Sequence, residues 1–213
     1  MEAGDAHCVR DAESNCGDAF TNILPPAIRM ITISADVWQQ MLGEFSKERR
    51  RVEQVCYLDG FLTEHVGVVT TLTIPLARLE PGRFEVSAEA MSQAGKHLRA
   101  HKLRRLAQVH THPGEWVGHS EWDDEKAYSK KAGSISIVLP HYARNQPGLE
   151  DAGIHLHTGE TWRQLDAHEA AQMVRIVPGF LDFRPPIKEP REQEHIQSTP
   201  ERSWWGFVRF WRR

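Results

Sequence analysis

Residues 108–124, QVHTHPGEWVGHSEWDD, carry the most informative pattern in this chain. His110 is the last residue of an expected strand over 106–110. His112 lies two residues further on, just beyond the end of that strand. The two-residue period of a strand points both imidazoles to one face. Ser120 begins an expected helix over 120–131, with Asp123 in its first turn. Two imidazoles and a carboxylate can hold one zinc ion and leave its fourth position open.

Each half of this pattern also has a simpler interpretation. A His-x-His pair at a strand end is more often a polar surface feature, and Ser120-x-x-Asp123 alone is a helix cap followed by an acid. Together they are harder to dismiss, because composition alone produces His-x-His-x7-Ser-x-x-Asp in roughly 2 of 1000 such chains. The combination therefore favours a metal site.

The composition indicates one ordinary soluble domain. The chain has 213 residues, 40% of them hydrophobic, and a formal charge of −3. This near-neutral net charge argues against a protein whose main function is to bind nucleic acid. Three cysteines cannot form a disulfide framework, and no apolar run approaches the ~18 residues of a membrane span. The polar N-terminus is unlike a secretory signal, so we expect a cytoplasmic protein.

The expected organisation is a single domain with a tail at each end. Residues 1–24 are expected to be disordered, 25–178 to fold, 179–203 to form a Pro-rich linker, and 204–213 to form an aromatic, basic segment. The patterning predicts helices over 35–51, 88–102, 120–131 and 167–174, and strands over 29–34, 52–62, 67–74, 83–87, 106–110, 134–139, 153–157 and 161–165. This is an α/β (α+β) pattern.

The spacing of His110, His112, Ser120 and Asp123 resembles the JAMM motif of the JAB/MPN zinc metalloproteases, in particular the bacterial JAB type. The resemblance covers about residues 28–177. It includes EQVCYLDG from Glu53, which is similar to the family's Glu-leading strand, and the downstream segments SISIVLP and TGETWRQL. It implies a mixed central sheet flanked by helices.

The resemblance also implies a function and a role for each site residue. His110, His112 and Asp123 would hold one Zn²⁺ per chain. Glu53 would accept the proton of the attacking water and pass it to the leaving amine, and Ser120 would donate to the developing oxyanion. The substrate would be a peptide or isopeptide bond at the C-terminal tail of ubiquitin or a ubiquitin-like protein. E1-like and E2-like enzymes would be the partners of the protein, and a bacterial ubiquitin-like conjugation or anti-phage defence system would be its biological setting.

Two other functions remain open. One is removal of an amino acid from the C-terminus of a sulfur-carrier protein, and the other is a non-catalytic MPN scaffold. Within the site, Glu64, Glu85 and Glu89 are the alternatives to Glu53 as base. Cys56 and Asp59 depart from the family's strand pattern.

Several residues outside the motif have two interpretations. Glu115, Trp116 and His119 could contact a substrate tail or form a solvated loop anchored by one tryptophan. His155 and His157 repeat the His-x-His spacing, but no Ser-x-x-Asp follows, so we expect an exposed strand face and no second metal.

The end of the chain, residues 204–213 (WWGFVRFWRR), is too aromatic for a solvated tail. As a helix it would carry Trp204, Phe207, Val208 and Trp211 on one side. From Trp204 to Arg213 it could dock on its own domain, bind a partner or a second copy, or lie in a membrane interface. The first two are favoured over the membrane.

Overall fold

The computed structural model describes residues 30–184. Its strands are β1 (Met30–Ser34), β2 (Val55–Leu62), β3 (Val66–Thr73), β4 (Ala77–Glu80), β5 (Arg83–Val86), β6 (Arg104–Thr111), β7 (Ile135–Leu139), β8 (Gly153–His157), β9 (Trp162–Gln164) and β10 (Val174–Val177). Its helices are α1 (Ala35–Lys47), α2 (Ala88–Ala100), α3 (Glu121–Lys126) and α4 (Ala167–Met173), with 3-10 turns η1 (His141–Ala143) and η2 (Leu149–Asp151).

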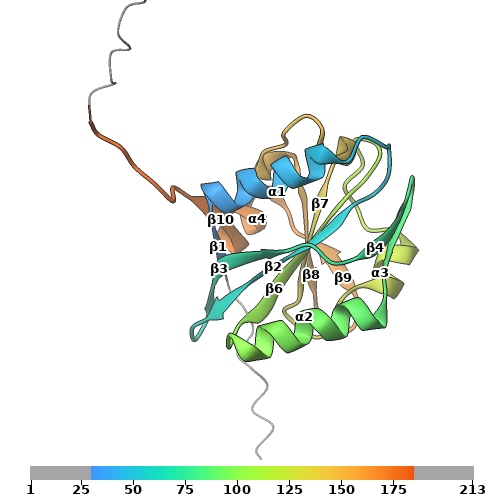
Figure 1. The fold of residues 1–213 in the computed structure, drawn as a ribbon, viewed down its shortest axis with the longest axis horizontal. Coiled ribbons are helices and arrows are strands. Elements are labelled where there is room, and N and C mark those ends of the chain that lie inside the picture. Colours follow the sequence, from blue (N-terminus) through green and yellow to red (C-terminus); the bar gives the residue numbers. More distant parts are fainter. Residues whose placement is uncertain (1–29, 185–213) are drawn as a thin grey trace, which may run out of the picture. The chain divides into compact units, whose positions relative to one another are not determined.

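Eight of the described strands form one mixed sheet in the order β10-β1-β3-β2-β6-β7-β8-β9. Strand β6 runs antiparallel to β2 and parallel to β7, and is therefore paired along both edges. The curled sheet has α1 on one side and α2 on the other (Figure 1). The predicted mixed sheet flanked by helices is confirmed. The remaining pair, β4 and β5, forms a separate antiparallel hairpin.

Helix α1 shows how local signals and packing combine. The Ser34 side chain accepts a hydrogen bond from the backbone N–H of Val37 (3.2 Å), which caps the first turn. The apolar face of the helix is buried in the main core through Trp38, Met41, Leu42 and Phe45. The helix ends at Lys47, earlier than the predicted 51, because Glu48 is extended (φ −76°, ψ 114°). The chain then turns toward β2.

Helix α3 is also shorter than predicted, with six residues where 120–131 was expected. Ala127 leaves the helical conformation (φ −53°, ψ 140°). The next side chain, Tyr128, packs against Tyr57, and its hydroxyl accepts a hydrogen bond from the Ile135 backbone N–H (3.3 Å). Tertiary packing of this tyrosine ends the helix, against a sequence that would allow it to continue.

Strands β4 and β10 were not predicted. Each has only four residues. Strand β10 exists because Val174–Val177 pairs in parallel with β1, at the other end of the domain's sequence. Such non-local pairing leaves little trace in a short segment.

The predicted disordered residues 1–24, most of the predicted linker and the aromatic segment 204–213 lie outside the described residues. The domain boundaries at 25 and 178 stay predictions. Within residues 30–184, no helix is both long and apolar enough to cross a membrane.

Candidate metal centre

Strand β6 places both histidines of the motif inside the protein. Opposite His110 lie Val55 of β2 and Val138 of β7, so its side chain is fully buried. His112 follows one residue after the strand ends, and two backbone hydrogen bonds hold it there. Its N–H donates to the Leu139 carbonyl (2.8 Å), and its carbonyl accepts from the Tyr142 N–H (2.7 Å).

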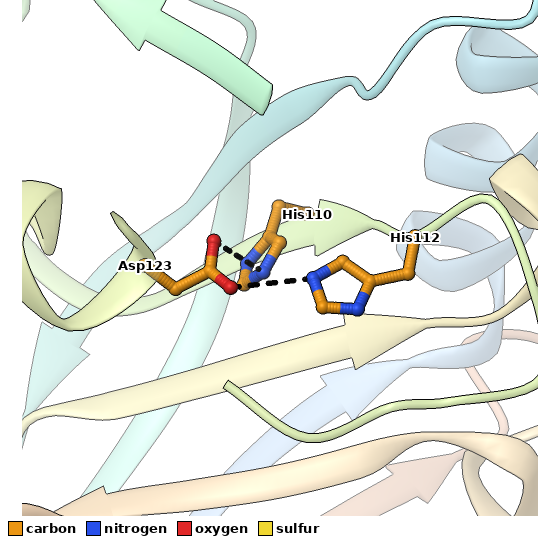
Figure 2. A group of neighbouring side chains, drawn as sticks. All are labelled: His110, His112 and Asp123. Carbon is orange, nitrogen blue, oxygen red and sulfur yellow. Dashed lines mark ion pairs between the residues drawn. The ribbon is translucent and has the colours of Figure 1, made fainter. Parts of the chain in front are cut away.

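Helix α3 brings Asp123 to the two imidazoles. One oxygen, Oδ1, lies 3.3 Å from Nε2 of His110, and the other, Oδ2, lies 3.4 Å from Nε2 of His112. Figure 2 shows the Asp123 carboxylate pointing toward both imidazole rings. The three candidate ligand atoms lie within 4.8 Å of one another, and all three residues are buried.

The protonation states of His110 and Asp123 suit ligands of a cation. Burial lowers the pKa of His110, so this imidazole is neutral. Burial alone would raise the pKa of Asp123, but its contacts with His110, His112 and Ser120 hold it well below the usual range. For His112, the neighbouring Asp123 carboxylate outweighs burial and raises the pKa.

The donor set fits a divalent metal ion. Nε2 of His110 is buried, faces Asp123 without a well-directed hydrogen bond, and has no other partner among the described residues. A buried polar atom left this way costs free energy unless something binds it. Two imidazole nitrogens and one carboxylate oxygen are common ligands of zinc at sites that keep a fourth position open.

Glu53 lies beside this cluster, just before β2. The residue is buried, and its N–H donates to the Glu80 carbonyl (2.8 Å). Burial raises the pKa of the Glu53 carboxyl to about 7, with His112 opposing and Asp123 adding to the rise. Glu53 is thus close enough to His112 and Asp123 for their charges to act on its carboxyl.

The three alternative bases are different. Glu64 lies in the turn between β2 and β3, Glu85 on β5, and Glu89 in the first turn of α2. All three are exposed. None shares the buried surroundings of Glu53.

Ser120 is the N-cap of α3, as expected, and its side chain is fully engaged. Its hydroxyl accepts from the Asp123 N–H (3.2 Å) and donates to Asp123 Oδ2 (2.6 Å). The Ser120 N–H donates to the same oxygen (2.8 Å). The hydroxyl proton of Ser120 therefore orients the Asp123 carboxylate in this structure.

The three predicted contact residues in the loop from β6 to α3 differ in their exposure to solvent. Glu115 and Trp116 are exposed, and the Trp116 ring stacks on His112 (5.1 Å, 24°) while its carbonyl lies 3.1 Å from His112 Nδ1. His119 points inward, with its side chain only 5% exposed. The expectation of a solvated loop is therefore wrong for His119.

The expectation that His155 and His157 form an exposed strand face is also wrong, because both are buried. His155 stacks on His119 with ring centres 4.0 Å apart. His157 accepts from the Gly159 N–H through Nδ1 (3.0 Å) and packs edge-on against Trp162. Strand β8 has the loop on one face and the core on the other, so neither face is solvated.

The β4–β5 hairpin is the part of the site that sequence reasoning missed. Its Phe84 ring packs against His110 (5.3 Å), and the Phe84 carbonyl accepts from the Trp122 indole N–H (3.3 Å). At its turn, the Pro81 carbonyl accepts from the Tyr142 hydroxyl (2.9 Å). The only sequence signals for these contacts were the Pro81-Gly82 turn and the strand expected after it.

Comparison with known proteins finds a relative described as a probable metalloprotease. The chain is 30% identical over 92 residues to a probable metalloprotease of Sinorhizobium fredii (strain NBRC 101917 / NGR234). The match covers 43% of this chain and 56% of that relative, so the chain spans about half the length of the curated protein. The convergence of the motif residues and this partial match together support the resemblance of the chain to the JAB/MPN metalloproteases.

Solved structures were compared with this chain, and one of them shares its fold. A protein from Desulfitobacterium hafniense superposes with a TM-score of 0.55 at 16% identity, covering 70% of this chain and 94% of its own. A JAB1/MPN domain protein from Archaeoglobus fulgidus has a TM-score of 0.39 at 14% identity, covering 71% and 99%. No protein-family model matches the sequence.

Proposed function

We propose that this protein is a zinc-dependent metallopeptidase of the JAB/MPN family that hydrolyses peptide or isopeptide bonds at the C-terminal tail of a ubiquitin-like protein. The observation that carries the proposal is the buried convergence of His110, His112 and Asp123, with the perturbed carboxyl of Glu53 beside them. A structural role needs neither a buried imidazole without a well-directed hydrogen bond nor the raised carboxyl pKa.

Zinc is the proposed ion because His₂Asp with an open position suits it. Bound there, it would supply Lewis acidity, which polarises a substrate carbonyl and lowers the pKa of water. His110 enters as a neutral imidazole and Asp123 as a carboxylate, so both offer a lone pair without first losing a proton.

Glu53 is the proposed general base. A base works best when its pKa lies near the working pH, and burial raises that of Glu53 to about 7. Its carboxylate would take one proton from the attacking water as oxygen bonds to the substrate carbonyl carbon. The carboxylic acid would return that proton to the leaving nitrogen as the C–N bond breaks.

Ser120 is proposed to act in two ways. In this structure its hydroxyl donates to Asp123, which holds the carboxylate in place. When an oxyanion develops nearby, the same O–H can turn and donate to it, since a hydroxyl carries one proton and rotates freely. The Ser120 N–H still holds Asp123 during that turn.

The substrate class and the partners are the finer part of the proposal. The exposed Glu115 and Trp116 lie in the loop beside His112, where an extended chain entering the site would pass. A ubiquitin-like tail is such a chain, and E1-like and E2-like enzymes would be its partners. Glu115 and Trp116 are the proposed contacts, without His119.

The test uses a ubiquitin-like protein extended at its C-terminus either through a peptide bond or through a lysine isopeptide bond. Zinc-loaded wild-type protein should release the extension, as measured by mass spectrometry, and a chelator should stop the reaction. Glu53→Ala should bind zinc without hydrolysis, and His112→Ala should lose both. Chelator-insensitive cleavage by either variant would refute the mechanism.

The same spectra separate the alternatives. Loss of one terminal amino acid from a diglycine-ended carrier, with no cleavage of the extended substrates, would favour the sulfur-carrier reaction. Absence of bound metal and of any product would favour the scaffold.

A further inference from the structure

His119 forms a buried junction behind the metal centre, outside the ligand set. Its Nδ1 lies 2.9 Å from Asp124 Oδ1, and its Nε2 lies 3.0 Å from the Ser136 hydroxyl. The carboxylate of Asp124 can only accept, so Nδ1 carries the proton and Nε2 accepts from Ser136. One imidazole therefore connects α3, through Asp124, with β7, through Ser136.

The ring of His119 is held from the side as well. It stacks on His155 of β8, with centres 4.0 Å apart and planes 18° from parallel. His155 in turn donates from Nε2 to the Val117 carbonyl (2.9 Å), two residues before His119. The His119 ring also lies 5.7 Å from the ring of His110. The junction thus fixes the end of the loop against the sheet beside the ligands.

Helix α3 needs such anchors because it is only six residues long. A helix of this length is not stable by itself, so tertiary contacts must set its position. On the β5 side, Trp122 donates to the Phe84 carbonyl. On the β7 side, the contact is the pair of His119 and Asp124. Asp123, the candidate ligand, lies between these two anchors in the sequence.

The capping box does not make the second anchor redundant. The Asp123 carboxylate accepts from both the N–H and the hydroxyl of Ser120, so this box depends on the same group that would bind the metal. The Asp124 carboxylate lies outside the candidate ligand set and can hold α3 whatever Asp123 contacts.

We propose that His119 is a positioning residue of the metal centre: by joining Asp124 on α3 to Ser136 on β7, it sets the place of the Asp123 ligand. This inference rests on the metal-binding part of the proposed function. It gives His119 a role that its spacing in the sequence does not show. It also separates His119 from Glu115 and Trp116, which keep their proposed contacts with substrate.

Three variants divide the contributions of ring and hydrogen bonds. His119→Phe keeps an aromatic ring against His155 and loses both hydrogen bonds. His119→Asn keeps a donor close to the position of Nδ1 and loses the ring. Asp124→Ala removes the acceptor at a carboxylate that is 51% exposed, where truncation leaves the core intact. His97→Asn, on the exposed surface of α2, is the matched control.

The measurements are the zinc dissociation constant, by chelator competition, and the visible absorption of the cobalt-substituted protein, which reports ligand geometry. We expect His119→Phe and Asp124→Ala each to weaken zinc binding about tenfold and to alter the cobalt spectrum. His119→Asn should recover part of the affinity, and the double variant of His119→Phe with Asp124→Ala should lose no more than the worse single variant.

Wild-type affinity and an unchanged cobalt spectrum in Asp124→Ala would overturn the inference, even if His119→Phe failed to fold. Additive losses in the double variant would also overturn it. If the wild-type protein itself bound neither zinc nor cobalt, the proposed function would fail, which is a different result.

Discussion

At the scale of one residue, the burial of Glu53 lowers the stability of the folded protein at neutral pH and gives its carboxyl a pKa that suits a general base. Its carboxyl is held where the charged form is disfavoured, so its pKa rises to about 7. The folded protein then binds this proton more tightly than the unfolded chain does. The stabilisation is complete below about pH 4.5 and is lost as the pH rises through about 7.

The variant Glu53→Gln tests this dependence in the chelator-treated protein. Glutamine imitates the neutral acid at every pH. The variant should therefore match wild type near pH 4.5 and be more stable at pH 8, by up to about 3 kcal/mol. Denaturant unfolding at both pH values measures the difference. If the stability difference between variant and wild type were equal at the two pH values, burial would not raise the pKa of Glu53.

Asp59, which departs from the family's strand pattern, is explained by a buried ion pair. Its Oδ1 lies 3.1 Å from Nε of Arg105, and its Oδ2 accepts from the Thr73 hydroxyl (2.6 Å). The guanidinium of Arg105 also lies over the Tyr57 ring, 3.6 Å from its centre. The acid in an otherwise apolar strand thus has a partner that lies 46 residues away in sequence.

Asp59→Ala should therefore lower the free energy of unfolding by about 3 kcal/mol, because the largely buried Arg105 is left without its counter-charge. Asp59→Ala combined with Arg105→Met should be more stable than Asp59→Ala alone. Chemical denaturation of both variants measures this. Additive losses would show that the two charges do not depend on each other.

At the scale of the element, the crossing of the loop over β8 depends on Gly153. A Cβ at this position would collide with the backbone carbonyl of Val117, the atom that His155 holds. Gly153 therefore lets the segment before α3 approach the sheet closely enough for His119 to reach Ser136.

Gly153→Ala should lower the free energy of unfolding by about 2 kcal/mol and also weaken metal binding, because the loop must move away from β8. Gly114→Ala, in the same loop, is the control, since a Cβ there meets nothing within 4 Å. Thermal melts with and without zinc compare the two. Equal effects of the two substitutions would contradict the close approach.

The same elements show what could be predicted from the sequence. Strand β6 and the start of α3 were predictable because the His-x-His period and the Ser120 cap are local signals. The end of α3 was not, because Tyr128 leaves the helix to pack on Tyr57. The burial of His155 and His157 was missed since it depends on a loop from another part of the chain. The contact of Phe84 with His110 could not be predicted either, because it joins residues that are far apart in the sequence.

At the scale of the whole molecule, the metal centre joins segments distant in sequence. The candidate ligands come from β6, from the residue just after it and from α3. The proposed base, Glu53, precedes β2, and the β4–β5 hairpin packs on His110. An ion held there binds the folded protein and not the unfolded chain, so it should stabilise the whole domain.

Removing the metal should therefore lower the melting temperature, and returning zinc should restore it. At a free zinc concentration 1000 times the dissociation constant, the stabilisation should be about 4 kcal/mol. Magnesium, which prefers oxygen ligands, is the control ion and should not replace zinc. Differential scanning calorimetry measures both. A melting temperature unaffected by zinc would show that the ion does not link these segments.

The most direct test of the metal centre is the zinc content per chain, measured by elemental analysis of three purified proteins dialysed against zinc. Wild type and Glu53→Gln should each hold one zinc per chain, and the double variant of His110→Ala with His112→Ala should hold none. Wild-type protein without zinc, or a double variant that keeps it, would contradict the assignment of the centre to His110, His112 and Asp123.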